Sequence, residues 1–120
     1  TYPCQSPPWG QLNAVDANTG EVVWQRPVGV AEDLPEGKRN TGLPYGPAGP
    51  TATAGDLLFF ASLSDARLRA FNSVTGDELW SAELPGAAIS QPASFLGSDG
   101  RQYVSITVAG RVRAFALPRE

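Results

Sequence analysis

The side chains that most often carry out chemistry in proteins are scarce in this sequence. The 120 residues contain no His, one Cys (Cys4) and one Lys (Lys38). This excludes zinc sites built from His and Cys, Cys–His nucleophile pairs and His general bases within the chain. Cys4 has no partner for an internal disulfide. We expect it to be a small buried apolar side chain; a free thiol that joins two copies is the alternative.

Charge and composition disfavour two kinds of partner. Nine basic and twelve acidic residues give a net charge of −3, which argues against a nucleic-acid-binding protein. No apolar run approaches the length of a membrane span. Thirteen Gly and eleven Pro, interleaved with Val, Leu, Phe and Trp, are typical of a turn-rich all-β domain. Because the chain starts at Thr1 and lacks Met, we expect it to be a segment of a longer protein.

One sequence pattern occurs twice. Residues 12–24 and 68–80 share Leu, Ala, Thr, Gly and Trp at the same positions, 56 residues apart, and a third, incomplete copy begins at Val112. Alternating side chains predict a strand, the Thr-Gly pair predicts a tight turn in which Gly adopts a positive φ, and the residues up to Trp predict the return strand. Each copy is therefore a predicted β-hairpin that ends in Trp. Such units must pack on their neighbours to bury their faces.

The repeats and the apolar segments between them predict three successive sheets. Residues 10–30 would end one blade, residues 50–86 would form a complete four-stranded blade, and residues 90–117 would form an incomplete last blade. Residues 31–49 are a long Pro- and Gly-rich loop. The apolar run 57–61 predicts a strand buried on both faces. The predicted strands are 11–17, 21–27, 51–53, 57–62, 68–73, 78–83, 91–96, 102–108 and 112–117. Four-stranded sheets at this spacing indicate a β-propeller, of which the chain holds one complete and two partial blades.

Trp24 and Trp80 end the two hairpins. We expect both to be wedged between adjacent sheets, because an indole buries a large area while its N–H can still reach a carbonyl group. The alternative is stacking on a ligand, which requires a cleft, and the position at the end of a hairpin argues against it.

Several motifs resemble one family. The pattern Ala-x-Asp/Asn-x-x-Thr-Gly-x-x-x-Trp at 14–24 and 70–80 resembles the tryptophan-docking repeat of the pyrroloquinoline-quinone (PQQ)-dependent dehydrogenases, which are eight-bladed propellers. The stretch 3–10 is similar to the Pro-Cys-Gln-x-Pro-x-Trp-Gly stretch of membrane-bound quinoprotein glucose dehydrogenases, and residues 114–118 to their C-terminal Ala-Tyr-Ala-Leu-Pro. Quinate dehydrogenases of the same type share most of these features. The resemblance covers essentially the whole chain.

This resemblance implies that the parent protein is an enzyme at the periplasmic face of the inner membrane. It would oxidise glucose or a related sugar or cyclic polyol and pass electrons to ubiquinone. PQQ would be held near the propeller axis with Ca²⁺ or Mg²⁺, and an Asp would act as the base. In the family the base, the metal ligands and most PQQ contacts lie upstream of this segment. We therefore expect no catalytic residue and no metal ligand here, and an isolated chain that is inactive and binds no cofactor.

The resemblance marks two candidate contacts with the site. A family loop that ends in Gly-Gly-Pro approaches the PQQ, and its counterpart here contains Tyr45, Gly46, Pro47, Ala48 and Gly49. Ala48 replaces the first Gly of that pattern, and a plain Pro/Gly turn is the alternative. Asp65 matches an Asp of the family and is a candidate for the substrate entrance; a solvated turn residue is the alternative.

Two functional hypotheses follow, a dehydrogenase segment and a non-enzymatic scaffold of Trp-docked blades. Residues 108–112 join the last two strands directly, where family members usually carry a Gly-rich insertion, which implies a divergent member with altered substrate access or electron acceptor. The upstream blades of the same protein would be the natural partners. Since the partial blades leave strand edges open, we expect the isolated chain to self-associate through them.

Overall fold

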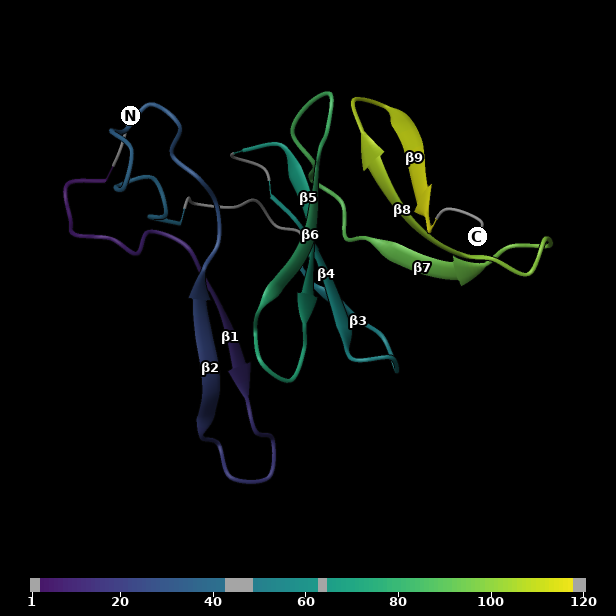
Figure 1. The fold of residues 1–120 in the computed structure, drawn as a ribbon, viewed down its shortest axis with the longest axis horizontal. Coiled ribbons are helices and arrows are strands. Elements are labelled where there is room, and N and C mark those ends of the chain that lie inside the picture. Colours follow the sequence, from purple (N-terminus) through teal and green to yellow (C-terminus); the bar gives the residue numbers. More distant parts are fainter. Residues whose placement is uncertain (1–2, 43–48, 63–64, 118–120) are drawn as a thin grey trace.

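The computed structural model describes residues 3–42, 49–62 and 65–117, which contain nine strands and no helix. The strands form three antiparallel sheets that follow one another in chain order (Figure 1). The first sheet pairs β1 (Gln11–Val15) with β2 (Val22–Pro27). The second consists of β3 (Thr51–Ala52), β4 (Leu57–Ala61), β5 (Arg67–Asn72) and β6 (Glu78–Glu83). The third consists of β7 (Ala93–Leu96), β8 (Gln102–Val108) and β9 (Arg111–Ala116).

These sheets confirm the expected all-β fold, with one four-stranded sheet between two partial ones. Some strand ends differ from the prediction by one or two residues. β7 begins at Ala93 because Pro92 has no N–H to donate to a neighbouring strand. β1 ends at Val15 because the next residue, Asp16, already belongs to the turn, where its backbone N–H donates to Glu21. Within the described ranges, no helix is long and apolar enough to span a membrane.

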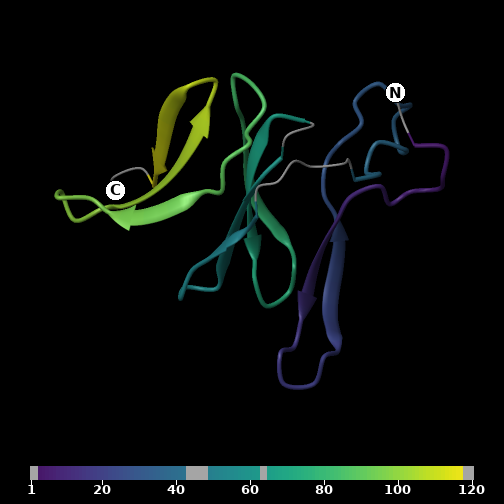
Figure 2. The ribbon, with the colours of Figure 1, turned by 180° about the vertical axis from the view of Figure 1, so that it is seen from behind.

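The second sheet lies between the other two (Figures 1 and 2), and its central strands β4 and β5 are therefore buried on both faces. Phe60 and Phe71 face the first sheet and pack with Val28, which follows β2. The opposite face contributes to a larger core with β8 and the segment after β6: Phe59, Ala61, Leu68, Ala70, Leu84, Ala88, Val104, Ile106 and Val108. The predicted double burial of residues 57–61 is therefore confirmed for Phe59 and Phe60, whose side chains belong to the two different cores.

The two repeat copies form the same turn. The backbone N–H of Gly20 donates to the carbonyl of Asp16 over 2.7 Å, and that of Gly76 donates to Asn72 over 2.8 Å. The two glycines adopt φ values of +75° and +77°, in the region that glycine enters without steric cost. In both turns the hydroxyl of the preceding Thr accepts the backbone N–H of the following residue, at 3.2 and 3.3 Å. The shared sequence pattern therefore encodes a shared backbone geometry.

The connection between the last two strands is a two-residue turn. Val108 pairs with Arg111, and the residues between them, Ala109 and Gly110, have φ values of +50° and +74°. Two positive φ angles are typical of the type I′ turn, which suits the right-handed twist of a hairpin. The short connection predicted at residues 108–112 is thus a well-formed hairpin turn.

The expected burial of Cys4 is wrong, because its side chain is exposed. Cys4 belongs to the Pro-rich segment before β1. Two hydrogen bonds from Trp9 to backbone carbonyl groups hold this segment in place. Trp9 donates its backbone N–H to the carbonyl of Thr41 over 2.8 Å, and its indole N–H to the carbonyl of Gln5 over 2.8 Å.

Candidate functional site

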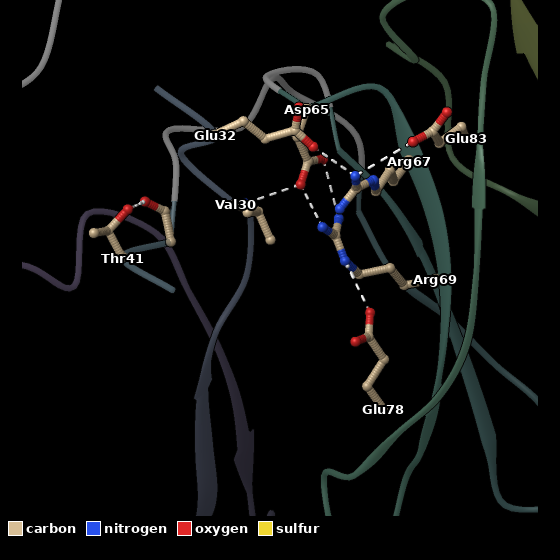
Figure 3. A network of polar contacts seen from close by, with 9 residues as sticks. Val30, Glu32, Thr41, Asp65, Arg67, Arg69, Glu78 and Glu83 are labelled. Carbon is tan, nitrogen blue, oxygen red and sulfur yellow. Dashed lines mark hydrogen bonds and ion pairs between the residues drawn. The ribbon is translucent and has the colours of Figure 1, made fainter. Parts of the chain in front are cut away.

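Charged side chains gather where the second sheet meets the segment that follows the first (Figure 3). The guanidinium group of Arg69, in β5, binds both carboxylate oxygens of Asp65: Nη1 lies 3.1 Å from Oδ1, and Nη2 contacts Oδ2. On its other side, Nε of Arg69 lies 3.0 Å from Oε1 of Glu78 in β6. The side chains of Arg69 and Asp65 are only 5% and 4% exposed, so this is a buried ion pair.

Local backbone geometry positions Asp65 for this pairing. Asp65 lies in the connection between β4 and β5, and Ala66 follows it with a φ of +52°. This left-handed residue turns the chain into β5. Within β5, Arg69 directly precedes the Ala70-Phe71 pair of the repeat. Because side chains in a strand alternate between faces, Arg67 and Arg69 lie on the same face.

Further contacts connect this pair to the segment after β2. The second Asp65 oxygen, Oδ2, accepts the backbone N–H of Val30 over 3.0 Å. Nη2 of Arg67 lies 2.6 Å from Oε1 of Glu32 and 3.4 Å from Oε1 of Glu83. The network therefore joins four parts of the chain: the segment after β2, the β4–β5 connection, strand β5 and strand β6.

The environment keeps Asp65 ionised at neutral pH. Burial on its own raises the pKa of Asp65, but the hydrogen bonds and positive charge of Arg69, together with the N–H of Val30, outweigh it and hold the pKa below its ordinary value of 3.8. A carboxylate that is both paired and acidic is a weak proton acceptor. This arrangement is suited to a positioning role, in which the Asp65–Arg69 ion pair holds the segment after β2 in place.

The lowered pKa of Asp65 predicts a loss of stability in acid. A carboxyl whose pKa is lower in the folded chain stabilises the fold fully above its unfolded pKa of about 3.9, and that contribution disappears as the pH falls through the folded value. The difference in free energy of unfolding between the wild type and Asp65→Asn should therefore be largest at neutral pH and shrink below about pH 4. Urea unfolding followed by circular dichroism at several pH values measures it. A difference that does not vary with pH would contradict the assignment; Asp77→Asn, at an exposed ion pair, is the control.

The structure describes only some of the predicted site residues. Tyr45, Gly46, Pro47 and Ala48 lie outside the described residues, so their contact with PQQ stays a prediction. Gly49 is described and partly buried, and a Cβ atom built on it would meet no atom within 4 Å. That open space is compatible with a flat group approaching the backbone. In the described ranges, no group of three or more His, Cys, Asp or Glu side chains could hold a metal ion.

For Asp65, the solvated-turn alternative is wrong because the carboxylate is buried against Arg69. A role at the substrate entrance stays a prediction. Sequence reasoning missed Arg69 as the partner of Asp65, and Glu78 as the second partner of Arg69. One signal was available: an Arg stands in the second repeat copy where the first has Asn13, four residues after an Asp.

Trp24 connects the first sheet to the second. Its indole N–H donates to the carbonyl of Ser73 over 2.9 Å, and its ring covers Gly76 so closely that a Cβ atom there would lie 2.6 Å from Cδ2. Arg26, on the same strand, adds a hydrogen bond of 3.1 Å to the Gly76 carbonyl and an ion pair of 3.1 Å with Asp77. The turn at residues 72–76 is thus a docking site for the preceding hairpin.

Trp80 lies between the second and third sheets, as expected, but its expected burial there is wrong. The side chain is 41% exposed and touches Phe115 edge-on, with ring centroids 5.6 Å apart. No described residue accepts a hydrogen bond from its indole, because the described part of the third sheet contains no turn equivalent to residues 72–76. Trp80 instead borders an apolar groove of about 680 Å³, with Leu57, Phe59, Leu79, Phe115 and Leu117 among its lining residues.

Comparison with known proteins decides the family. The model of the PQQ family, described as the β-propeller domain of glucose/ethanol/alcohol dehydrogenases, matches residues 1–104. The chain belongs to this family. The three sheets are therefore blades of a PQQ β-propeller, and the chain holds one complete blade and two partial ones.

Several relatives align over most of this PQQ propeller segment. It is 44% identical to the quinate/shikimate dehydrogenase (quinone) of Acinetobacter baylyi, an alignment that covers 90% of the chain and 14% of the relative. It is 36% identical to the quinoprotein glucose dehydrogenase of Escherichia coli, covering 97% of the chain and 16% of the relative. Among solved structures, a europium-containing methanol dehydrogenase superposes with a TM-score of 0.62 at 30% identity, covering 80% of the chain and 14% of that structure. The chain thus spans about one seventh of the length of the proteins it matches.

Proposed function

We propose that this chain is a blade segment of a PQQ-dependent dehydrogenase that oxidises glucose or a related sugar or cyclic polyol. The observation that supports the proposal most strongly is the similarity, over nearly the whole chain, to a quinate/shikimate dehydrogenase and to a quinoprotein glucose dehydrogenase. Both of these relatives are named for polyhydroxylated substrates. The electron acceptor that we propose is ubiquinone, and the proposed location is the periplasmic face of the inner membrane.

The chain would contribute one wall of the cofactor site. PQQ, together with Ca²⁺ or Mg²⁺, would supply the hydride-accepting chemistry of the dehydrogenase. In this proposal the backbone at Gly49, with residues 45–48 before it, approaches the cofactor. The Asp65–Arg69 pair fixes the segment after β2 through Val30, at the other end of the loop that leads to Gly49. The catalytic base and the metal ligands come from other blades.

A segment exchange tests this function. The matching segment of the E. coli quinoprotein glucose dehydrogenase would be replaced by this chain, and the same enzyme with its own segment re-inserted at the same junctions would be the control. We expect the exchanged enzyme to bind PQQ and to reduce an artificial dye and a ubiquinone analogue with glucose or quinate. A folded exchanged enzyme that fails to bind PQQ would contradict the proposal and favour the non-enzymatic scaffold.

The isolated chain should have no dehydrogenase activity. An axial cofactor site must be enclosed by several blades, and this segment provides only one complete blade. The purified chain, mixed with PQQ, Ca²⁺ and glucose, should leave the dye unreduced in an assay in which the E. coli enzyme is active. Dye reduction above the rate of PQQ and Ca²⁺ alone would show that the segment carries more of the site than we propose.

A further inference from the structure

The first strands of the second and third sheets begin in the same way. β3 begins at Thr51, directly after Pro50, and β7 begins at Ala93, directly after Pro92. Among the described strands, each of the two lies at an edge of its sheet and has a single neighbour. Because proline has no backbone N–H, only its carbonyl group can form a backbone hydrogen bond. Each sheet therefore presents a proline carbonyl at the start of an edge strand.

A side chain beside the other strand donates to each of these two carbonyl groups. The carboxamide Nε2 of Gln91 donates to the Pro50 carbonyl over 3.0 Å. In return, the hydroxyl of Thr51 donates to the Pro92 carbonyl over 2.5 Å. The two hydrogen bonds are reciprocal and join the same two strand ends, and we call them the proline clamp.

The proline clamp supports a strand that is short. β3 has only two residues, which pair with Phe59 and Leu58 of β4. A short edge strand opens at low cost in free energy, because few backbone hydrogen bonds hold it. The clamp adds a connection to the third sheet at the residue where β3 begins.

The effect of the proline clamp extends to Gly49 through the backbone. A Cβ atom built on Gly49 would meet no atom within 4 Å, so no described group packs on that side of the residue. The next residue is Pro50, whose ring fixes its own φ and restricts the backbone of the residue before it. A hydrogen bond that holds the Pro50 carbonyl therefore also limits the orientations open to Gly49.

We propose that Gln91 and Thr51 are positioning residues of the dehydrogenase, which hold the backbone at Gly49 in place for contact with PQQ. The inference rests on the proposed function, because Gly49 is the described part of the wall that approaches the cofactor in that proposal. Neither of the two side chains needs to touch PQQ. A binding surface that is already ordered loses less conformational entropy when the ligand binds, so the clamp should increase the affinity for PQQ.

The exchanged enzyme described under the proposed function tests the positioning role. Its apo form would be titrated with PQQ at a fixed Ca²⁺ concentration, and binding followed by absorbance. Gln91→Met and Thr51→Val should each raise the Kd for PQQ about fivefold, the effect of one lost hydrogen bond. Thr51→Ser keeps the hydroxyl group and should bind PQQ like the unaltered segment.

Gln102→Met is the matched control. Nε2 of Gln102 donates to Oγ of Ser94 over 2.9 Å, an exposed hydrogen bond within the third sheet that does not reach β3. Since Gln91→Met and Gln102→Met each remove one exposed carboxamide hydrogen bond, they should lower the melting temperature by a similar small amount. Only Gln91→Met should weaken PQQ binding, whereas a purely structural role would give the two variants equal effects.

Hydrogen exchange in the purified 120-residue chain gives a measurement that needs no cofactor. The backbone N–H of Thr51 should exchange faster in Gln91→Met than in the wild type or in Gln102→Met, because β3 is then held less firmly at its start. Equal exchange at Thr51 in all three chains would overturn the clamp.

The two measurements separate failure of this inference from failure of the proposed function. An exchanged enzyme that binds PQQ equally well with and without Gln91→Met would overturn the positioning role and leave the proposed function intact. An exchanged enzyme that binds no PQQ even with the unaltered segment would contradict the proposed function and overturn the positioning role with it. Faster exchange at Thr51 together with weaker PQQ binding, both confined to the clamp variants, is the result that supports the inference.

Discussion

Replacing Arg69 by Met should lower the free energy of unfolding at neutral pH by about 3–5 kcal/mol, the largest loss that we expect from a single substitution. The substitution leaves the carboxylate of Asp65 buried, with the backbone N–H of Val30 as its remaining charge-stabilising donor. An uncompensated buried charge costs far more than the pair itself contributes. Urea unfolding followed by circular dichroism measures the loss.

Two further variants separate this effect from ordinary loss of a salt bridge. Arg26→Met breaks an ion pair whose side chains are 47% and 63% exposed, and it should cost only about 1 kcal/mol. The double variant Asp65→Asn/Arg69→Met buries no lone charge and should recover part of the loss. If Arg69→Met and Arg26→Met destabilise equally, the Asp65–Arg69 pair is not buried as described.

Replacing Trp24 by Ala should cost about 3 kcal/mol, near the lower end for Trp→Ala substitutions because the side chain is only partly buried. It removes the hydrogen bond to Ser73 and the ring that covers Gly76. Trp80→Ala should cost about 1–2 kcal/mol, since that indole is much more exposed and has mainly Phe115 as an aromatic neighbour. Thermal and urea unfolding of the two variants, measured at a concentration where the chain is monomeric, would compare them.

Two glycines in equivalent turns, Gly76 and Gly20, test the contact between Trp24 and the turn at residues 72–76. Gly76→Ala and Gly20→Ala impose nearly the same backbone strain, about 1–2 kcal/mol, because their φ values are +77° and +75°. Only at residue 76 does the new methyl group meet a ring, that of Trp24. Gly76→Ala should therefore destabilise the monomer more than Gly20→Ala. Equal losses would show that the Trp24 ring does not rest on this turn.

The parts of the fold that sequence reasoning predicted are those encoded locally. The hairpins follow from the repeat at 12–24 and 68–80, because the alternation of side chains and the Thr-Gly turn are properties of neighbouring residues. The double burial at 57–61 follows from an uninterrupted apolar run. The same signals predicted the order of the sheets along the chain, since successive hairpins pack beside one another.

What sequence reasoning missed depends on contacts between distant residues. Trp24 and Trp80 end two copies of the same repeat, yet Trp24 rests on the turn at residues 72–76 and Trp80 is 41% exposed, because the described residues contain such a turn only beside Trp24. Asp65 resembled a solvated turn residue because its cover comes from Val30 and Arg69, which lie on different elements. Cys4 was expected to be buried because cysteine is usually a buried residue type, but neither hydrophobic core includes the segment before β1.

The central sheet has a neighbour on each face, whereas each outer sheet has one, and this difference sets the order in which the molecule opens. Amide protons of β4 and β5 should exchange with solvent only when the whole chain unfolds. Those of β1 and β2 should exchange sooner, through release of a hairpin held mainly by Trp24, Arg26 and Val28. A protease added to the native chain would accordingly cut first in the hairpin that leads into β2, and leave the second and third sheets as the resistant fragment.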